Sequence, residues 1–394
     1  MTGKRTHVVV VGGGYAGTLA ANHLRLRGDI DITLVNPRPK FVERIRLHQL
    51  VAGTGEATAD YGTLLGEGIQ LVVDSASRIN TGAQTIEFAS GRRPLHYDYL
   101  IYAVGSTGAV PASVPGAAEF AYPIAELELA QRLRAAIDEL HPDAPVTVVG
   151  AGLTGVEMAS ELAEQGRKVT LVCGGLLAPS LSDPARRSVA TWMRKHGVTV
   201  LESDVVAEVR EGAVVFADGA VRPSAVTIWT AGFGVPELAA ASGLRTDALG
   251  RLLTDETLTS VDDAHIVAAG DCAAPSDQPL RMSCQAAGPL GTQAADTVLS
   301  RIAGQMPGVI EPRFVGTCTS LGRKGAVVQV SHKDDSPTRV HVHGRLAALV
   351  KEAICKGTLW GLRQEARKPG SGVVFKGDKR SVQAAAAPEV VTNP

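Results

Sequence analysis

The hydrophobic pattern of this chain contains the same arrangement twice. Residues 7–35 and 146–172 each read as a short apolar strand, a glycine turn, an amphipathic helix and a second apolar strand. Short β-like runs follow each unit, and a segment rich in proline and small residues, 111–123, reads as a crossover between them. The pattern therefore predicts an α/β fold with two similar units.

Both glycine turns carry G-x-G-x-x-G spacing. The first glycine of such a turn permits a tight bend, the second lets backbone N–H groups approach a pyrophosphate, and the third lets helix and strand pack closely. The alternative is a pair of tight turns without a ligand, but each copy follows an apolar strand and opens a helix, as the motif requires. We therefore predict two dinucleotide sites, at Gly12, Gly14 and Gly17 and at Gly150, Gly152 and Gly155.

The end of the second strand in each unit is the usual position of an acid that holds the ribose hydroxyls. The first unit has Asn36 there, which can still hydrogen-bond a ribose, and the second has Cys173, a weak hydrogen-bonding group. No Arg or Lys follows within residues 173–180 to bind a 2′-phosphate. The sequence thus leaves the choice between NADH and NADPH open.

Composition narrows the class of protein further. A length of 394 residues predicts two or three domains, and a formal net charge of -1 argues against nucleic acid as a partner. The five cysteines form no C-x-x-C or C-x4-C pair, so we expect no metal site and no dithiol redox centre. No stretch approaches the roughly 20 apolar residues of a membrane span, and we expect a cytoplasmic protein.

Three later segments carry a family resemblance: "YDYLIYAVGS" at 97–106, "IWTAGFGVPELAAASGL" at 228–244 and "IVAAGDCA" at 266–273. Together with the glycine turns they resemble flavoproteins of the pyridine-nucleotide oxidoreductase superfamily, in the branch of type II NADH dehydrogenases and apoptosis-inducing-factor-like proteins. The resemblance covers roughly residues 7–330 and implies two Rossmann-like domains, one for FAD and one for NADH or NADPH.

The resemblance also implies a domain layout and an order of electron transfer. Hydride would pass from the nicotinamide to the flavin, and electrons would then pass to an acceptor. We expect an FAD domain that is split in the sequence, at residues 1–112 and 236–305, with an NAD(P)H domain inserted at 113–235. A small C-terminal α+β region would follow at 306–367, and a flexible tail at 368–394.

Site residues follow from the matching motif positions. For FAD these are Gly12, Gly14, Tyr15, Ala16, Gly17, Asn36, Arg44, Ala103, Gly105 and Asp271, where Asp271 would accept a hydrogen bond from the ribityl chain. For NAD(P)H they are Gly150, Gly152, Leu153, Thr154, Gly155, Glu157, Cys173 and Gly232.

Glu157 matches a family glutamate near the nicotinamide, and the alternative is an acid favoured by the helix dipole. Arg44 and His48 lie where this branch runs along the flavin, and the alternative is a solvated basic helix face.

The acceptor is less clear from the sequence. Type II NADH dehydrogenases line their quinone site with two glutamines four residues apart. Gln285 matches the first and is, with Glu157, a candidate catalytic residue, whereas Pro289 stands at the second position and would distort a helix. Cys284 reads as a packed residue rather than a reactive thiol. We expect a quinone or another small acceptor, with a ferredoxin-type reductase or a redox-sensing flavoprotein as alternatives.

A helix predicted over residues 345–366 has an amphipathic pattern. A basic amphipathic helix with a tryptophan suits a membrane interface at the cytoplasmic face, through residues 345–363. We instead expect its apolar face to pack on the protein itself or on a second subunit of a homodimer. That face comprises Leu346, Leu349, Val350, Ala353, Ile354, Gly357 and Trp360.

Overall fold

Two parallel sheets organise the residues that the computed structural model describes, 5–372 and 377. The first sheet has the order β21-β9-β1-β2-β5 and the second the order β11-β18-β12-β13-β14. All neighbouring strands in both are parallel. This arrangement confirms the predicted α/β class with two Rossmann-like domains. Most of the predicted tail, 368–394, lies outside the described residues.

The strands of the first sheet are β1 (Thr6–Val11), β2 (Ile30–Asn36), β5 (Ile69–Val73), β9 (Tyr99–Tyr102) and β21 (Ile266–Ala268). Those of the second are β11 (Ala121–Pro123), β12 (Val146–Val149), β13 (Val169–Val172), β14 (Thr199–Leu201) and β18 (Val226–Trp229). The first sheet therefore takes its edge strand β21 from a part of the chain beyond the second sheet.

Strand β1 shows why its apolar run is continuous. Val8 and Val10 enter the core on one face of the sheet, while Val9 and Val11 enter the core on the other. Successive side chains of a strand point to opposite faces, so a sheet covered on both sides needs apolar residues at every position. The valines that suggested a buried strand are thus divided between two separate cores.

Helices cover these sheets. On the first, α1 (Tyr15–His23) packs against α8 (Cys284–Ile302), so closely that a Cβ on Gly291 would approach the Ala16 carbonyl oxygen to 2.4 Å. Helix α8 runs through Pro289 without a break, so the proline lies inside it as an irregularity that the fold tolerates. The second sheet carries α4 (Leu127–Glu139), α5 (Leu153–Glu164) and α6 (Asp183–Lys195).

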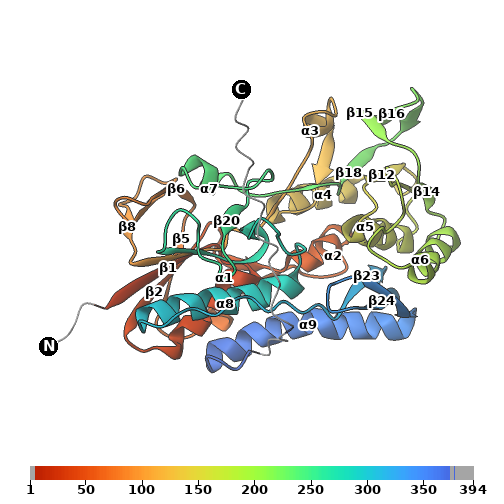
Figure 1. Ribbon diagram of the computed structural model, residues 1–394. Helices are drawn as coiled ribbons and strands as arrows, with labels where there is room; N and C mark the ends of the chain where they lie inside the picture. The colour runs from red at the N-terminus through yellow and green to blue at the C-terminus, as the bar shows by residue number, and fades with distance from the viewer. Residues whose placement is uncertain (1–4, 373–376, 378–394) are drawn as a thin grey trace, which may run out of the picture.

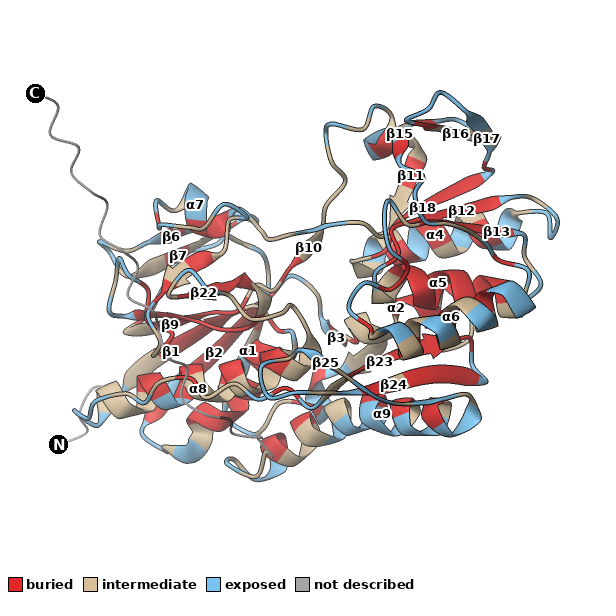
Figure 2. Ribbon diagram, turned by 45° about the vertical axis from the view of Figure 1, so that its right-hand side comes forward, coloured by how far each residue is buried: buried red, intermediate tan, exposed pale blue. Residues whose placement is uncertain are grey.

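The repeat extends to a small antiparallel sheet in each unit. These are β6-β7-β8 (Ala76–Asn80, Thr85–Phe88, Leu95–His96) and β15-β16-β17 (Val206–Arg210, Ala213–Phe216, Val221–Pro223). Short strands β10 (Thr107–Gly108) and β19 (Phe233–Gly234) pair where the chain passes between the two units (Figure 2).

Further short elements are α2 (Leu47–Ala52), α3 (Ala117–Phe120), α7 (Leu238–Ala241), β3 (Lys40–Val42), β4 (Thr58–Asp60), β20 (Leu252–Thr254) and β22 (Ala273–Pro275).

The C-terminal region combines an antiparallel sheet with one long helix. The strands are β23 (Gly316–Leu321), β24 (Gly325–Ser331) and β25 (Pro337–His343), and the helix is α9 (Arg345–Arg367). Helix α9 runs beneath both units, drawn in blue in Figure 1, and contacts β24 and α1. Since Lys351 of α9 also pairs with Glu157 of α5, the helix bridges the two nucleotide-binding units.

The apolar face predicted for this helix is not covered by the described chain. All seven of its residues are exposed, with Leu349 71% and Trp360 58% accessible. The opposite side is buried, and it carries Ala347, Cys355 and Lys351. Small residues let this side approach the sheet closely, and Lys351 finds an acidic partner there. The expectation that the apolar face packs on the protein itself was therefore wrong.

A buried histidine fixes the far end of α9. The ring of His23 in α1 contacts the Asp296 carboxylate at 3.0 Å and the fully buried Glu365 carboxylate at 2.7 Å. Glu365 also accepts hydrogen bonds from the backbone N–H groups of Gly370 and Gly372, at 2.7 and 2.6 Å. Burial alone would lower the pKa of His23, but the two carboxylates outweigh it and raise the pKa to about 9.

This cluster predicts a pH-dependent C-terminal contact. Because the pKa of His23 is raised from 6.5 to about 9, its stabilising effect is complete below pH 6.5 and lost as the pH rises through about 9. Amide protection at Gly370 and Gly372, corrected for intrinsic exchange, should fall over that window. At neutral pH, His23→Gln should lower the free energy of opening at these two amides by about 3 kcal/mol, because the buried Glu365 carboxylate loses its partner.

The matched control is His265→Gln, which removes an exposed histidine paired with Asp263 at 3.1 Å. It should leave protection at both glycines unchanged. The same pH dependence in wild type and His23→Gln would contradict the role of His23.

Candidate functional site

The first glycine turn has the geometry of a pyrophosphate cradle. Gly12 has φ +104°, and a Cβ there would approach the Ala103 carbonyl oxygen to 2.2 Å. A Cβ on Gly17 would lie 1.9 Å from the Gly12 carbonyl oxygen, so helix and strand pack closely. A Cβ on Gly14 would meet no atom within 4 Å, so the ligand side is open. These residues fit the dinucleotide that the motif predicts.

The second turn repeats this geometry. Gly150 has φ +104°, and its Cβ would approach the Ala231 nitrogen to 2.8 Å. A Cβ on Gly155 would lie 1.8 Å from the Gly150 carbonyl oxygen, whereas one on Gly152 would meet nothing within 4 Å. Helix α5 opens at once after the turn, with Leu153 and Thr154 in its first turn, so its N-terminus faces the open side.

The predicted strand-end residues occupy different environments. Asn36 accepts a hydrogen bond from the Gly13 N–H at 2.9 Å and donates to the Arg38 carbonyl at 2.7 Å, so it shapes the first turn. Tyr61, which the sequence reasoning missed, donates its hydroxyl to the Gly13 carbonyl at 2.6 Å. Cys173 follows β13, and burial raises the pKa of its thiol to about 12.

The fold brings Arg44 and Asp271 together through a residue that the sequence reasoning missed. Arg44 donates to the Ser106 hydroxyl at 2.8 Å, and this hydroxyl donates to the Asp271 carboxylate at 2.7 Å. Arg44 also donates to the Ala125 carbonyl at 3.0 Å, and burial lowers its pKa. Ser106 ends the segment "AVGS" quoted for the family resemblance, after Gly105 with φ +71°, and this was the available signal.

The remaining predicted residues lie on the same two turns. Tyr15 packs edge-on against Phe41 with ring centroids 5.0 Å apart, and burial raises the pKa of its hydroxyl. Ala16 is buried where a Cβ on Gly270 would meet it at 3.1 Å. Gly232, with φ +85°, follows β18 near the second turn.

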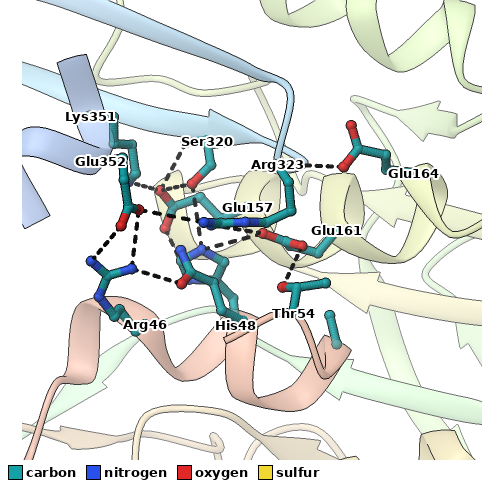
Figure 3. A network of polar contacts seen from close by, with 12 residues as sticks. Arg46, His48, Thr54, Glu157, Glu161, Glu164, Ser320, Arg323, Lys351 and Glu352 are labelled. Carbon is teal, nitrogen blue, oxygen red and sulfur yellow. Dashed lines mark hydrogen bonds and ion pairs between the residues drawn. The ribbon is translucent and has the colours of Figure 1, made fainter. Parts of the chain in front are cut away.

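A buried polar network joins α2, α5, β23 and α9 (Figure 3). Its centre is Glu157, whose carboxylate pairs with Lys351 and accepts hydrogen bonds from the Ser320 N–H at 3.0 Å and hydroxyl at 3.2 Å. The His48 ring lies 3.5 Å from the other carboxylate oxygen. Glu161, one turn along α5, accepts a hydrogen bond from Thr54 at 2.9 Å.

The titratable groups of this network differ in their pKa values. Burial opposes ionisation of Glu157, but the contacts of its carboxylate, with the charge of Lys351 foremost, together outweigh burial, so the pKa of Glu157 is lowered and it forms an ion pair with Lys351. Burial lowers the pKa of His48 to about 4, so the ring is neutral at physiological pH. Burial raises the pKa of Glu161 to about 7. The alternative interpretation of a solvated basic helix face is therefore wrong for His48, because its side chain is 3% exposed.

Gln285 has a structural partner of its own. In the amide orientation that satisfies both ends, it donates to the Gly316 carbonyl at 3.0 Å and accepts from the Val315 N–H at 2.9 Å. Its neighbour Cys284 is held as a neutral thiol, because burial raises its pKa to about 11. All five cysteines lie in the described part of the chain, and none of them forms a disulfide.

Comparison with known proteins agrees with this geometry. Residues 6–291 match the family model of the pyridine nucleotide-disulphide oxidoreductases. The chain is 27% identical over 365 residues to the NADH dehydrogenase-like protein YutJ of Bacillus subtilis, covering 90% of this chain and 97% of that protein. It is 26% identical over 424 residues to a type II NADH:quinone oxidoreductase of Staphylococcus epidermidis, covering 96% and 100% of the two chains.

Solved structures share the fold. NDH2 of Plasmodium falciparum superposes with a TM-score of 0.77 at 16% identity, over 92% of this chain and 97% of that one. The sulfide:quinone oxidoreductase of Aquifex aeolicus gives a TM-score of 0.77 at 21% identity, over 91% and 92%. The chain belongs to the pyridine nucleotide-disulphide oxidoreductase family. It is an FAD-dependent NAD(P)H oxidoreductase.

The buried ion pair predicts a specific pattern of stability. Lys351→Met should lower the free energy of unfolding by about 3–5 kcal/mol, because Glu157 is left as an uncompensated buried charge. The double variant Glu157→Gln with Lys351→Met should recover most of this loss. Thermal unfolding of both variants, followed by circular dichroism, measures the difference.

Lys356→Met is the matched control, since Lys356 is 73% exposed and lies 3.7 Å from Glu352. An exposed pair of this kind contributes about 1 kcal/mol or less. Equal losses in the Lys351 and Lys356 variants would contradict the buried pair.

Proposed function

We propose that this protein is an FAD-dependent NAD(P)H dehydrogenase that passes electrons to a quinone or another small acceptor without a dithiol relay. The observation that carries the proposal is the pair of open glycine turns, each built as a pyrophosphate cradle within one chain. The cysteines fit the second part, because burial raises the pKa of the Cys284 and Cys355 thiols to about 11 and so keeps them protonated. We further propose that the site residues act as their motif positions imply.

Bound FAD would supply the hydride acceptor for the nicotinamide and the electron donor for the second substrate. The chain's own residues hold and orient the groups. Gly12, Gly14 and Gly17 form the flavin cradle, and the Arg44, Ser106 and Asp271 chain offers a fixed carboxylate beside it. Glu157 and Lys351 keep opposite charges in a water-poor site at the base of α5.

The quinone part of the proposal rests on the relatives named type II NADH:quinone oxidoreductases. Neither of the paired glutamines that line the quinone site in that branch has a free counterpart here. Gln285 binds the backbone at the start of β23, and Pro289 stands at the second position. A quinone would therefore be held by other groups at this end of α8. The test must compare acceptors directly.

The deciding experiment follows the flavin colour without oxygen. Purified protein should be yellow and bleach with NADH or NADPH, and a menaquinone analogue should then restore the colour at least tenfold faster than dissolved oxygen. Reoxidation only by a one-electron acceptor would favour a ferredoxin-type reductase. Rapid bleaching without turnover on any acceptor would favour a redox sensor.

Two glycine variants control this experiment. Gly14→Val and Gly152→Val each place a side chain in open space, so the fold should persist. The first should yield colourless protein, and the second should yield yellow protein that no nicotinamide bleaches. Yellow protein from Gly14→Val would contradict the assignment of the flavin to the first turn.

We also propose a peripheral membrane contact at the cytoplasmic face through α9. Its exposed apolar side, Leu346, Leu349, Val350, Ile354 and Trp360, is flanked by exposed Arg345 and Lys356. Such a helix lies in the membrane interface and gains from anionic lipids. Within the described residues, none of the helices has the length and apolar character needed to cross a bilayer.

Sedimentation with phosphatidylglycerol vesicles tests this contact. The double variant Leu349→Gln with Trp360→Gln should lower the partition coefficient at least about tenfold, because two large apolar side chains are lost from the interface. Met306→Gln is the control, since Met306 is 92% exposed elsewhere on the surface. Unchanged binding, with a concentration-dependent dimer that the double variant abolishes, would assign the face to a homodimer instead.

A further inference from the structure

The parallel strands β13 and β14 leave their sheet side by side. Val172 and Leu201, their last residues, are in register, and the Cys173 N–H donates to the Leu201 carbonyl at 2.8 Å. The next residue after β14 is Glu202. In such a fold the ribose-binding acid usually stands at the end of the second strand, and here Cys173 follows β13 at that position. Glu202 therefore places an acid beside the position that Cys173 occupies.

The loop after β13 holds the Glu202 carboxylate in place. The Gly175 N–H donates to the Glu202 carbonyl at 2.6 Å, and the Leu177 N–H donates to the Glu202 carboxylate at 3.2 Å. The same loop is tied to the second glycine turn, because the Ala178 N–H donates to the Ala151 carbonyl at 2.9 Å. The carboxylate is thus fixed on a loop that joins the strand end to the pyrophosphate cradle.

Space and charge at this position suit a ribose. Glu202 is exposed, and a Cβ on Gly174 or Gly175 would meet nothing within 4 Å. Glu202 follows β14 directly beside Cys173. Burial and then the Glu202 charge raise the pKa of Cys173 to about 12. Residues 173–182 and 202–205 contain no Lys or Arg and include a second acid, Asp204.

We propose that Glu202 binds the adenosine ribose hydroxyls of the nicotinamide nucleotide, in place of an acid at the end of β13, and so makes this site select NADH over NADPH. The proposal rests on the proposed function, because it assigns the nucleotide to the second glycine turn. Two vicinal hydroxyls can donate to a fixed carboxylate. A 2′-phosphate would bring negative charge against Glu202, and residues 173–182 and 202–205 supply no Lys or Arg to balance it.

A purely structural role for Glu202 predicts something different. If the carboxylate only accepted the Leu177 N–H, its removal would affect the loop and both nucleotides alike. Glu202→Gln keeps one oxygen that can accept that hydrogen bond, while it removes the charge and the second acceptor oxygen. The ratio between the two nucleotides therefore separates recognition from loop support.

Equilibrium binding to the oxidised holoenzyme gives a readout that does not depend on turnover. Isothermal titration calorimetry should show NAD⁺ binding at least about tenfold more tightly than NADP⁺. Glu202→Gln should weaken NAD⁺ binding about tenfold, because a hydrogen bond to a charged group is lost. Its NADP⁺ binding should stay the same or tighten, so the preference should disappear.

Two further variants serve as a control and as a rescue. Glu211→Gln removes an exposed acid from the turn between β15 and β16 of the same unit and should leave the ratio unchanged. Adding Cys173→Asp to Glu202→Gln places an acid at the usual strand end and should restore the NAD⁺ preference. A rescue of this kind would not follow from loop support alone.

Three outcomes would overturn the proposal: equal binding of both nucleotides by wild type, tighter binding of NADP⁺, or an unchanged ratio in Glu202→Gln. The proposed function is judged separately by the flavin colour. If NADH bleaches the wild-type flavin and the variant keeps its preference, only the role of Glu202 fails. If neither nucleotide binds or bleaches the flavin, both proposals fail.

Discussion

A buried ion pair holds the two halves of the molecule and its C-terminal region in one arrangement. Glu157 lies on the helix that opens at the second glycine turn, and Lys351 lies on the long helix beneath both units. Separating two buried opposite charges is costly, so the position of α9 is coupled to that of α5. His48 of α2 closes the network from the side of the first unit.

The same coupling explains which side of α9 is covered. A helix normally buries its most apolar side, yet α9 turns that side outward and buries Lys351 with Ala347 and Cys355. The pairing of Lys351 with Glu157 and the close fit of small residues fix the rotation of the helix. The exposed apolar side is therefore a consequence of a polar contact inside the protein.

The sequence predicted a residue's position best where the neighbouring residues in the chain determine that position. The glycine turns were predictable because their spacing alone determines the close approaches seen at Gly17 and Gly155. Prediction was weaker where strands or helices distant in sequence meet. Ser106 between Arg44 and Asp271, and Glu202 beside Cys173, depend on strand order, which no local pattern specifies. The orientation of α9 was missed because amphipathic spacing does not identify the partner of a buried lysine.

The order in which strands enter the two sheets also bears on synthesis of the chain. The second sheet is complete once Trp229 has emerged from the ribosome, whereas the first still lacks β21. Until residues 266–268 follow, β9 is an open strand edge that another chain could pair with. Between these two points of translation, the nascent protein thus carries a finished nucleotide-binding half beside one whose sheet still has an open edge.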